Sequence, residues 1–186
     1  MLASASPRRV DLLAQIGVIP TRIVAAHIDE TPRPREVPSA LAKRLAFEKA
    51  GTIAAQEQDA LILAADTVVS VGRRILPKCE TADEARACLQ LMSGRAHRVH
   101  SGVCLIDGAR HWRRLVTSRV HMRRLATQDI EAYLAGGEWK GKAGGYAIQG
   151  HAAAFISNII GSYSNIVGLP LFETANLLQA AGFRSA

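Results

Sequence analysis

One carboxylate interrupts the most apolar part of the chain. Residues 60–65 form a continuous apolar run of strand length, Asp66 and Thr67 follow it, and the β-branched residues 68–71 then resume it. A buried carboxylate is costly unless a cation or hydrogen-bond donor compensates it, so we expect Asp66 to face a divalent metal or an activated water. The alternative is an aspartate that caps a turn where the strand ends.

The remaining pattern alternates strands with helices. We expect strands at residues 1–3, 21–28, 60–65, 68–71, 97–106 and 112–124, and helices at residues 7–16, 39–56, 81–92, 127–134 and 171–181. Asp107 and Gly108 predict a hairpin between the two longest strands, and Thr127 is the expected N-cap of the fourth helix. Helices mixed with hairpins favour an α/β fold in which helices flank a mixed central β-sheet.

Length and composition favour a compact soluble enzyme or binding protein. The 186 residues are enough for one domain, expected at 1–186, without disulfide staples, and the three cysteines lie far apart in the sequence. We therefore expect reduced, buried thiols. No apolar run reaches the roughly 18 residues of a membrane helix, and no signal peptide is evident. The expected location is the cytoplasm.

The net charge of +7 suits a polyanionic partner, which can be nucleic acid, an acidic membrane surface or a phosphorylated small molecule. Aromatic residues make up only 5% of the chain and do not interleave with basic ones, so a small phosphorylated ligand is favoured. Six arginines gather on the two hairpin strands, where a solvated face is favoured over a nucleic-acid surface: Arg110, Arg113, Arg114, Arg119, Arg123 and Arg124.

Residues 4–9 resemble an anion-binding site. Ser6 is the expected N-cap of a helix with Pro7 at its first position, and the segment adds free backbone N–H groups, two hydroxyls and the guanidinium groups of Arg8 and Arg9. The alternative is a well-capped helix with surface arginines.

Other candidate site residues are convincing only together with neighbouring motifs. Glu30 is a possible second carboxylate for the metal of Asp66, and Lys49 and Lys78 are possible phosphate ligands, although each is more often solvated when taken alone. The glycine-rich residues 142–150 suit a loop that lets a planar base approach, with Gln149 reading the base edge. The alternative for that loop is a hairpin turn with a buried tyrosine.

Six blocks in order resemble the Maf family across nearly the whole chain: residues 2–9 (LASASPRR), 44–50 (RLAFEKA), 65–67 (ADT), 93–97 (SGRAH), 142–150 (KAGGYAIQG) and 168–171 (GLPL). The resemblance implies a house-cleaning nucleotide pyrophosphatase with two lobes around a cleft, related in fold to inosine triphosphate pyrophosphatases. The form of the 142–150 block is similar to the branch that cleaves dTTP and UTP. The resemblance also implies a divalent cofactor, Mg²⁺ or Mn²⁺, and a possible homodimer.

The resemblance also implies roles for single residues. Asp66 would be the proton acceptor that activates water, with Glu30 beside it near the metal. The other implied residues act on substrate: Arg8, Thr67 and Gln149 on the choice of base, and Ser4, Arg9, Lys49 and Lys78 on the phosphates. Two departures stand out. Cys79 follows Lys78 where the family usually has proline. Relatives commonly carry a few more apolar residues before residue 2, so we expect either a clipped first strand or a true start codon upstream of Met1.

The expected reaction is an in-line attack of water on the α-phosphorus, which yields the nucleoside monophosphate and pyrophosphate. Two alternatives stay open. One is the same reaction on modified or methylated nucleotides. The other is a regulator of septum formation that binds nucleotides or nucleic acid without catalysis; the high charge favours it, whereas Asp66 and the lack of stacking aromatics oppose it.

Overall fold

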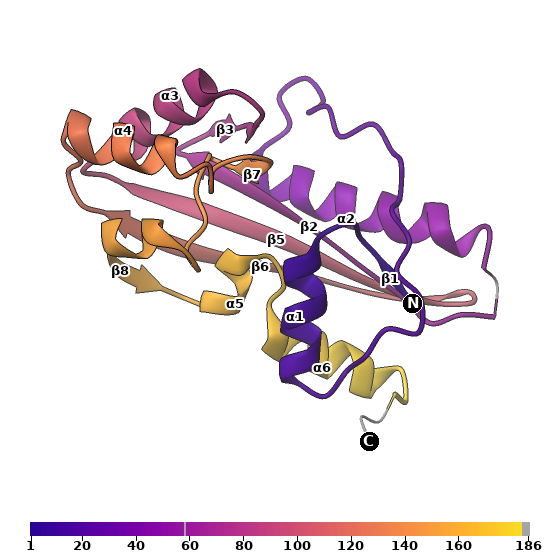
Figure 1. Cartoon of the computed structure of the whole chain (residues 1–186). Coiled ribbons are helices and arrows are strands. Elements are labelled where there is room, and N and C mark those ends of the chain that lie inside the picture. Colours follow the sequence, from indigo (N-terminus) through magenta and orange to yellow (C-terminus); the bar gives the residue numbers. More distant parts are fainter. Residues whose placement is uncertain (58, 184–186) are drawn as a thin grey trace.

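A six-stranded sheet organises the molecule. The computed structural model describes residues 1–57 and 59–183 (Figure 1). The strands follow the order β1-β2-β5-β6-β8. The sixth strand, β3, pairs with β2 farther along that strand than β1 does. Their bounds are β1 Leu2–Ala3, β2 Ile62–Val71, β3 Arg74–Leu76, β5 Ala96–Asp107, β6 Arg110–Met122 and β8 Ile156–Ile160. Only β1 and β2 run parallel, so the predicted mixed sheet is confirmed and is mostly antiparallel.

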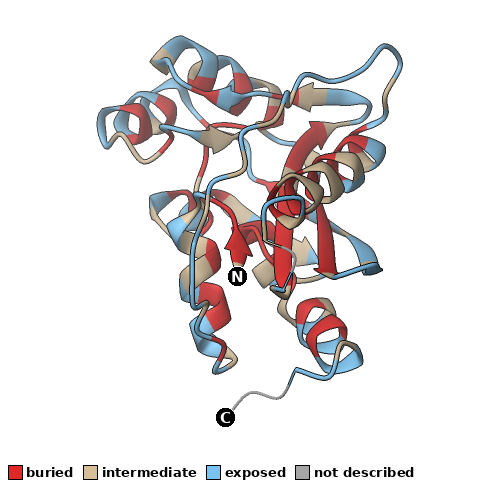
Figure 2. Ribbon diagram, turned by 90° about the vertical axis from the view of Figure 1, so that its right-hand side faces the viewer, coloured by how far each residue is buried: buried red, intermediate tan, exposed pale blue. Residues whose placement is uncertain are grey.

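Helices flank this sheet, as predicted. They are α1 Pro7–Gln15, α2 Pro38–Ala54, α3 Ala82–Met92, α4 Thr127–Ala135, α5 Tyr163–Val167 and α6 Leu171–Ala180, with a 3₁₀ helix at His151–Phe155. A second, two-stranded sheet joins β4 (Lys78–Cys79) to β7 (Lys142–Ala143). Figure 1 shows α3 and α4 at one end of the large sheet, and α1 and α6 towards the other. Buried residues concentrate in the sheet and on the helix faces turned towards it (Figure 2).

The alternation of side chains along β2 divides the core. Ile62 and Ala64 pack against residues of α2, whereas Leu63 and Ala65 point to the opposite side and join the larger core with α1 and α6. Asp66 continues the α2 side of the strand, and Thr67 continues the other side. Neighbouring residues therefore serve the two faces of one strand.

The edge of β2 is open at these two residues. β1 pairs with Leu63 and Ala64 and then ends, and β3 begins its pairing only at Val69. Between the two, residues 65–68 have no strand partner on that edge within the described chain. The gap leaves room for other segments to approach Asp66 and Thr67.

Gly102 of β5 lies opposite Asp66 in the sheet register. A Cβ atom there would lie 2.2 Å from the carbonyl oxygen of Ala42 in α2. The helix backbone thus rests directly on the sheet at this point, which only glycine permits.

Some sequence predictions were wrong. Residues 21–28 form no strand but only one parallel bridge between Ile23 and Leu2, because β1 is two residues long and offers nothing further to pair. The runs at 60–65 and 68–71 are one strand that continues through Asp66. Ala126 rather than Thr127 precedes α4, and the Asp129 carboxylate accepts the Ala126 N–H.

Six short elements of the described chain had no sequence signal strong enough to predict them: β3, β4, β7, the 3₁₀ helix, β8 and α5. Each is at most five residues long, so local periodicity says little about it. Among the described residues, no helix has both the length and the apolar character needed to cross a membrane.

Gly102→Ala should lower the free energy of unfolding by about 1–3 kcal/mol or more, because the new methyl group must push apart two backbones. Urea denaturation measures this directly. The matched control is Gly51→Ala in α2, where a Cβ meets no atom within 4 Å. That change should raise stability by about 0.5–1 kcal/mol. Equal stability of Gly102→Ala and the unmodified chain would contradict the close approach of α2 to β5.

Candidate functional site

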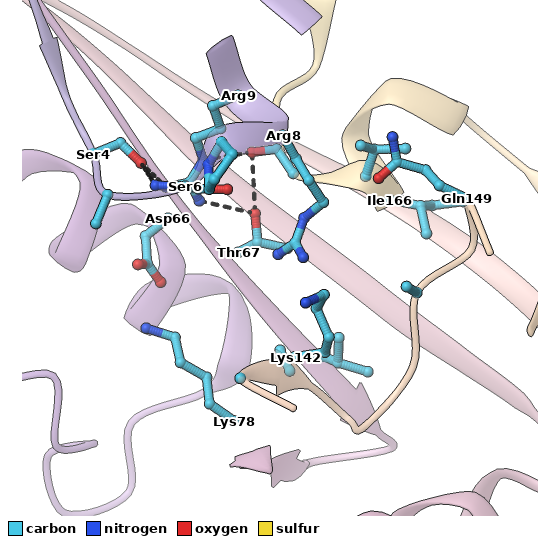
Figure 3. A pocket seen from close by; sticks show the side chains of 18 of the residues that line it. Ser4, Ser6, Arg8, Arg9, Asp66, Thr67, Lys78, Lys142, Gln149 and Ile166 are labelled. Atoms are coloured by element: carbon cyan, nitrogen blue, oxygen red, sulfur yellow. Dashed lines mark hydrogen bonds between the residues drawn. The ribbon is translucent and has the colours of Figure 1, made fainter. Parts of the chain in front are cut away.

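A cavity of about 400 Å³ opens beside the unpaired edge of β2. It is lined by the turn from β1 into α1, by α2 and β2, by the β4–β7 sheet, and by the loops around residues 140–149 and 166–168. Every residue that the sequence predicted for the site borders this cavity: Ser4, Arg8, Arg9, Glu30, Lys49, Asp66, Thr67, Lys78 and Gln149. Segments that are distant in sequence thus meet in one cleft (Figure 3).

The Lys49 ammonium joins two carboxylates at the base of the cavity. Its Nζ lies 2.5 Å from Asp66 Oδ1 and 2.6 Å from Glu30 Oε1. Asp66 and Lys49 are only 3% and 7% exposed, so this is a buried ion pair between β2 and α2. Burial of Asp66 is therefore compensated by a cation of the protein itself.

Glu30 links this pair to the second sheet, since its Oε2 accepts a hydrogen bond of 2.5 Å from Lys78 Nζ. Burial raises the pKa of Glu30, but hydrogen bonds and charges from Lys49 and Lys78 outweigh it and bring the pKa from 4.5 to about 2. The stabilisation by these contacts is complete above pH 4.5 and is lost as the pH falls towards 2. Glu30 is ionised at neutral pH.

The two carboxylates fit a divalent cation. Oxygens of Asp66 and Glu30 lie 2.5 Å and 2.6 Å from the same Lys49 nitrogen, so the two carboxylates are neighbours in the cavity wall and are close enough to share one ion. Mg²⁺ is usually held by one or two carboxylates together with substrate phosphates and water. The described residues contain no cluster of three or more metal-ligating side chains, so substrate and water would have to complete the coordination.

Arg9 connects the walls of the cleft. Its Nε donates to the Gly168 carbonyl at 2.9 Å, and its terminal nitrogens reach Ser4 Oγ at 2.8 Å and Thr67 Oγ1 at 3.4 Å. Thr67 also lies 2.8 Å from Ser101 Oγ. The buried guanidinium thus holds the β1–α1 turn, β2 and the end of α5 in fixed positions.

The N-terminus of α1 faces the cavity without a side-chain cap. Ser6 occupies the N-cap position and Pro7 the first helical position, as predicted, but the Ser6 hydroxyl makes no capping hydrogen bond. The Ser4 hydroxyl instead accepts the Ser6 N–H at 3.2 Å. The positive end of the helix is therefore directed at the cleft, beside two guanidinium groups.

The glycine-rich loop forms the far side of the cavity. Gly144 and Gly145 have φ of 71° and 67°, which other residues rarely adopt. Tyr146 is buried, as the alternative for this loop expected, and its hydroxyl lies 2.7 Å from His97 Nε2, but β7 pairs with β4 rather than within a hairpin of the loop. Gln149 is exposed at the pocket mouth and remains available to a ligand.

Sequence reasoning did not single out Lys142. It stands in the glycine-rich block, close to Lys140 in sequence, and two lysines in a polar loop have the pattern of solvated residues. The structure places Lys142 in the cavity wall, pointing towards Arg8 (Figure 3). Burial lowers the pKa of Arg8, and burial together with the charge of Arg8 lowers the pKa of Lys142.

The arginine cluster on the hairpin is largely engaged within the chain. Arg110 pairs with Asp107, Arg113 lies over the Phe47 ring, and Arg123 pairs with Asp129. These contacts favour the predicted solvated face. The three cysteines are free and buried, and burial raises the pKa of the Cys79 thiol to about 12.

Lys49→Met should lower the free energy of unfolding by about 3–5 kcal/mol, because it leaves Asp66 buried without its cation. Chemical denaturation at neutral pH measures the change. Lys43→Met, on the exposed side of the same helix, should stay within about 0.5 kcal/mol of the unmodified chain. Adding Asp66→Asn to Lys49→Met should recover much of the loss, and equal effects of the two lysine changes would rule out the buried pair.

The comparisons with known proteins point to one family. Residues 1–181 match the family model described as Maf-like protein. The dTTP/UTP pyrophosphatase of Chelativorans sp. (strain BNC1) is 56% identical over 192 residues, which cover 100% of this chain and 92% of the relative. That of Paramagnetospirillum magneticum is 58% identical over 98% of this chain and 97% of its own length. The chain therefore belongs to the Maf family.

Proposed function

We propose that this chain hydrolyses dTTP and UTP to the nucleoside monophosphate and pyrophosphate. The observation that carries the proposal is Asp66, a buried carboxylate held by Lys49 at the open edge of β2 and facing a cavity rich in cations. The names of the relatives, dTTP/UTP pyrophosphatase, support the same substrates.

The cavity suggests how a substrate would lie. Lys78 and Asp66 stand at one end and Gln149 at the other (Figure 3). A nucleotide whose base reaches Gln149 would direct its phosphates towards Asp66, Lys49 and Lys78. Ser4 and Arg9 would bind phosphate from the α1 side, while Arg8, Thr67 and Gln149 would influence which base is accepted.

Asp66 is suited to act as the general base. Its Oδ1 is fixed by Lys49, while Oδ2 accepts no hydrogen bond from any described residue. A water on Oδ2 would lose its proton to the carboxylate as its oxygen attacks the α-phosphorus. Pyrophosphate would leave on the opposite side, and nearby cations such as Lys78 would neutralise the charge that develops on it.

Asp66 and Glu30 would hold a divalent cation, Mg²⁺ or Mn²⁺, which when bound neutralises phosphate charge and polarises the phosphoryl oxygens. The residues of the chain itself hold the general base and the substrate. Lys49 keeps the Asp66 carboxylate in place, and the α1 N-terminus and arginines bind the anion.

Asp66→Asn should lower kcat at least about 100-fold, because the amide cannot accept the proton from water. Pyrophosphate release from a panel of canonical and modified nucleoside triphosphates, with Mg²⁺ or Mn²⁺, measures the loss. Binding of a non-hydrolysable dTTP analogue should stay within a few-fold of the unmodified chain. Asp11→Asn, exposed on α1, is the matched control and should keep full activity.

The panel also separates the alternatives. Turnover of a methylated guanine nucleotide but not of dTTP or UTP would show that the substrates are modified nucleotides. Full activity in Asp66→Asn would refute the role of this residue as base. If no nucleotide releases pyrophosphate and the chain slows the migration of oligonucleotides in a gel at physiological salt, the protein is a non-catalytic binding protein rather than an enzyme.

A further inference from the structure

The cations of the cavity differ in what they already bind. Lys49 and Lys78 pair with carboxylates, and the guanidinium of Arg9 is held by oxygens of Ser4 and Gly168. Arg8 and Lys142 pair with no carboxylate of the described residues, and Lys142 Nζ donates only to the Lys140 carbonyl at 3.1 Å. These two positive charges are therefore available to pair with an anionic ligand.

Arg8 and Lys142 approach each other from opposite walls. Arg8 belongs to the first turn of α1 and Lys142 to β7, and their side chains point towards one another across the cavity (Figure 3). Their like charges repel, and this repulsion adds to the larger effect of burial in lowering the pKa of Lys142. An anion placed between them would remove this repulsion and gain a charge-assisted hydrogen bond from each wall.

The position of this pair along the cavity identifies the anion. Figure 3 shows Arg8 and Lys142 between Asp66 and Gln149. In the proposed substrate pose, the base reaches Gln149 and water is activated at Asp66. A phosphate between Arg8 and Lys142 then lies on the nucleoside side of the bond that breaks. It is the α-phosphate, which stays with the nucleoside monophosphate.

We propose that Lys142 is a substrate-binding residue which, together with Arg8, holds the phosphate that the monophosphate product retains. This assignment rests on the proposed function. It divides the lysines of the small sheet between the two products: Lys142 serves the nucleoside monophosphate and Lys78 serves pyrophosphate. A guanidinium has five N–H donors, so contact with this phosphate leaves donors of Arg8 for the base.

The backbone fixes this division. Lys142 pairs with Cys79, the residue directly after Lys78, in the β4–β7 register. The Gly141 N–H donates to the Cys79 carbonyl at 2.8 Å, and the Gly144 N–H donates to the Pro77 carbonyl at 2.8 Å. One hydrogen-bonded ribbon therefore presents both lysines, so it can position them on two parts of the same triphosphate.

The test compares Lys142→Met with Lys78→Met by calorimetric titration of UMP and, separately, of inorganic pyrophosphate. Lys142→Met should weaken UMP binding about 10- to 100-fold and change pyrophosphate binding less than about threefold. Lys78→Met should show the reverse pattern. Lys142→Arg keeps the charge and should recover part of the UMP affinity, and Lys43→Met is the remote control.

Unchanged UMP affinity in Lys142→Met, or equal losses for UMP and pyrophosphate, would overturn the assignment. Failure of the unmodified chain to bind UMP would overturn it as well. The proposed function fails separately, if the unmodified chain binds both products but releases pyrophosphate from no nucleoside triphosphate. Circular dichroism of each variant establishes that the changes in affinity occur in a folded chain.

Discussion

Lys49 lies between Asp66 and Glu30, and the rest of the site depends on this contact. The ion pair ties α2 to β2 and compensates a carboxylate inside an otherwise apolar strand. It also fixes one oxygen of Asp66, and no described residue donates a hydrogen bond to the other. Gly102, opposite Asp66 in the register, lets α2 come close enough for the lysine to reach. Stability and the proposed chemistry thus depend on the same interaction.

The opening beside this pair follows from the point at which β1 ends. Since β1 ends after Ala3 and β3 starts its pairing at Val69, the sheet leaves Asp66 and Thr67 uncovered on one edge. The α1 N-terminus covers one side of the gap, and the β4–β7 sheet covers the other. Both walls carry cations, so a chain of phosphates is the kind of ligand that can bind both at once.

Much of this arrangement was predictable from local patterns. The continuous apolar run predicted a strand that leads up to Asp66, and capping residues and periodicity gave most helices to within two residues. Contacts between distant segments were not predictable. Residues 21–28 form only one bridge to β1 in place of the expected strand. The five-residue helix α5 is too short to give a periodic signal. Lys142 has the sequence pattern of a solvated loop lysine, and only its position in β7 shows that it points towards Arg8.

The central claim is that water held at Asp66 attacks the α-phosphorus. Hydrolysis of dTTP or UTP in oxygen-18 water, followed by mass spectrometry of both products, tests it most directly. The account predicts one heavy oxygen in the nucleoside monophosphate and none in pyrophosphate. Label in pyrophosphate, or release of inorganic phosphate in its place, would mean that water attacks another phosphorus and would contradict the assigned position of Asp66.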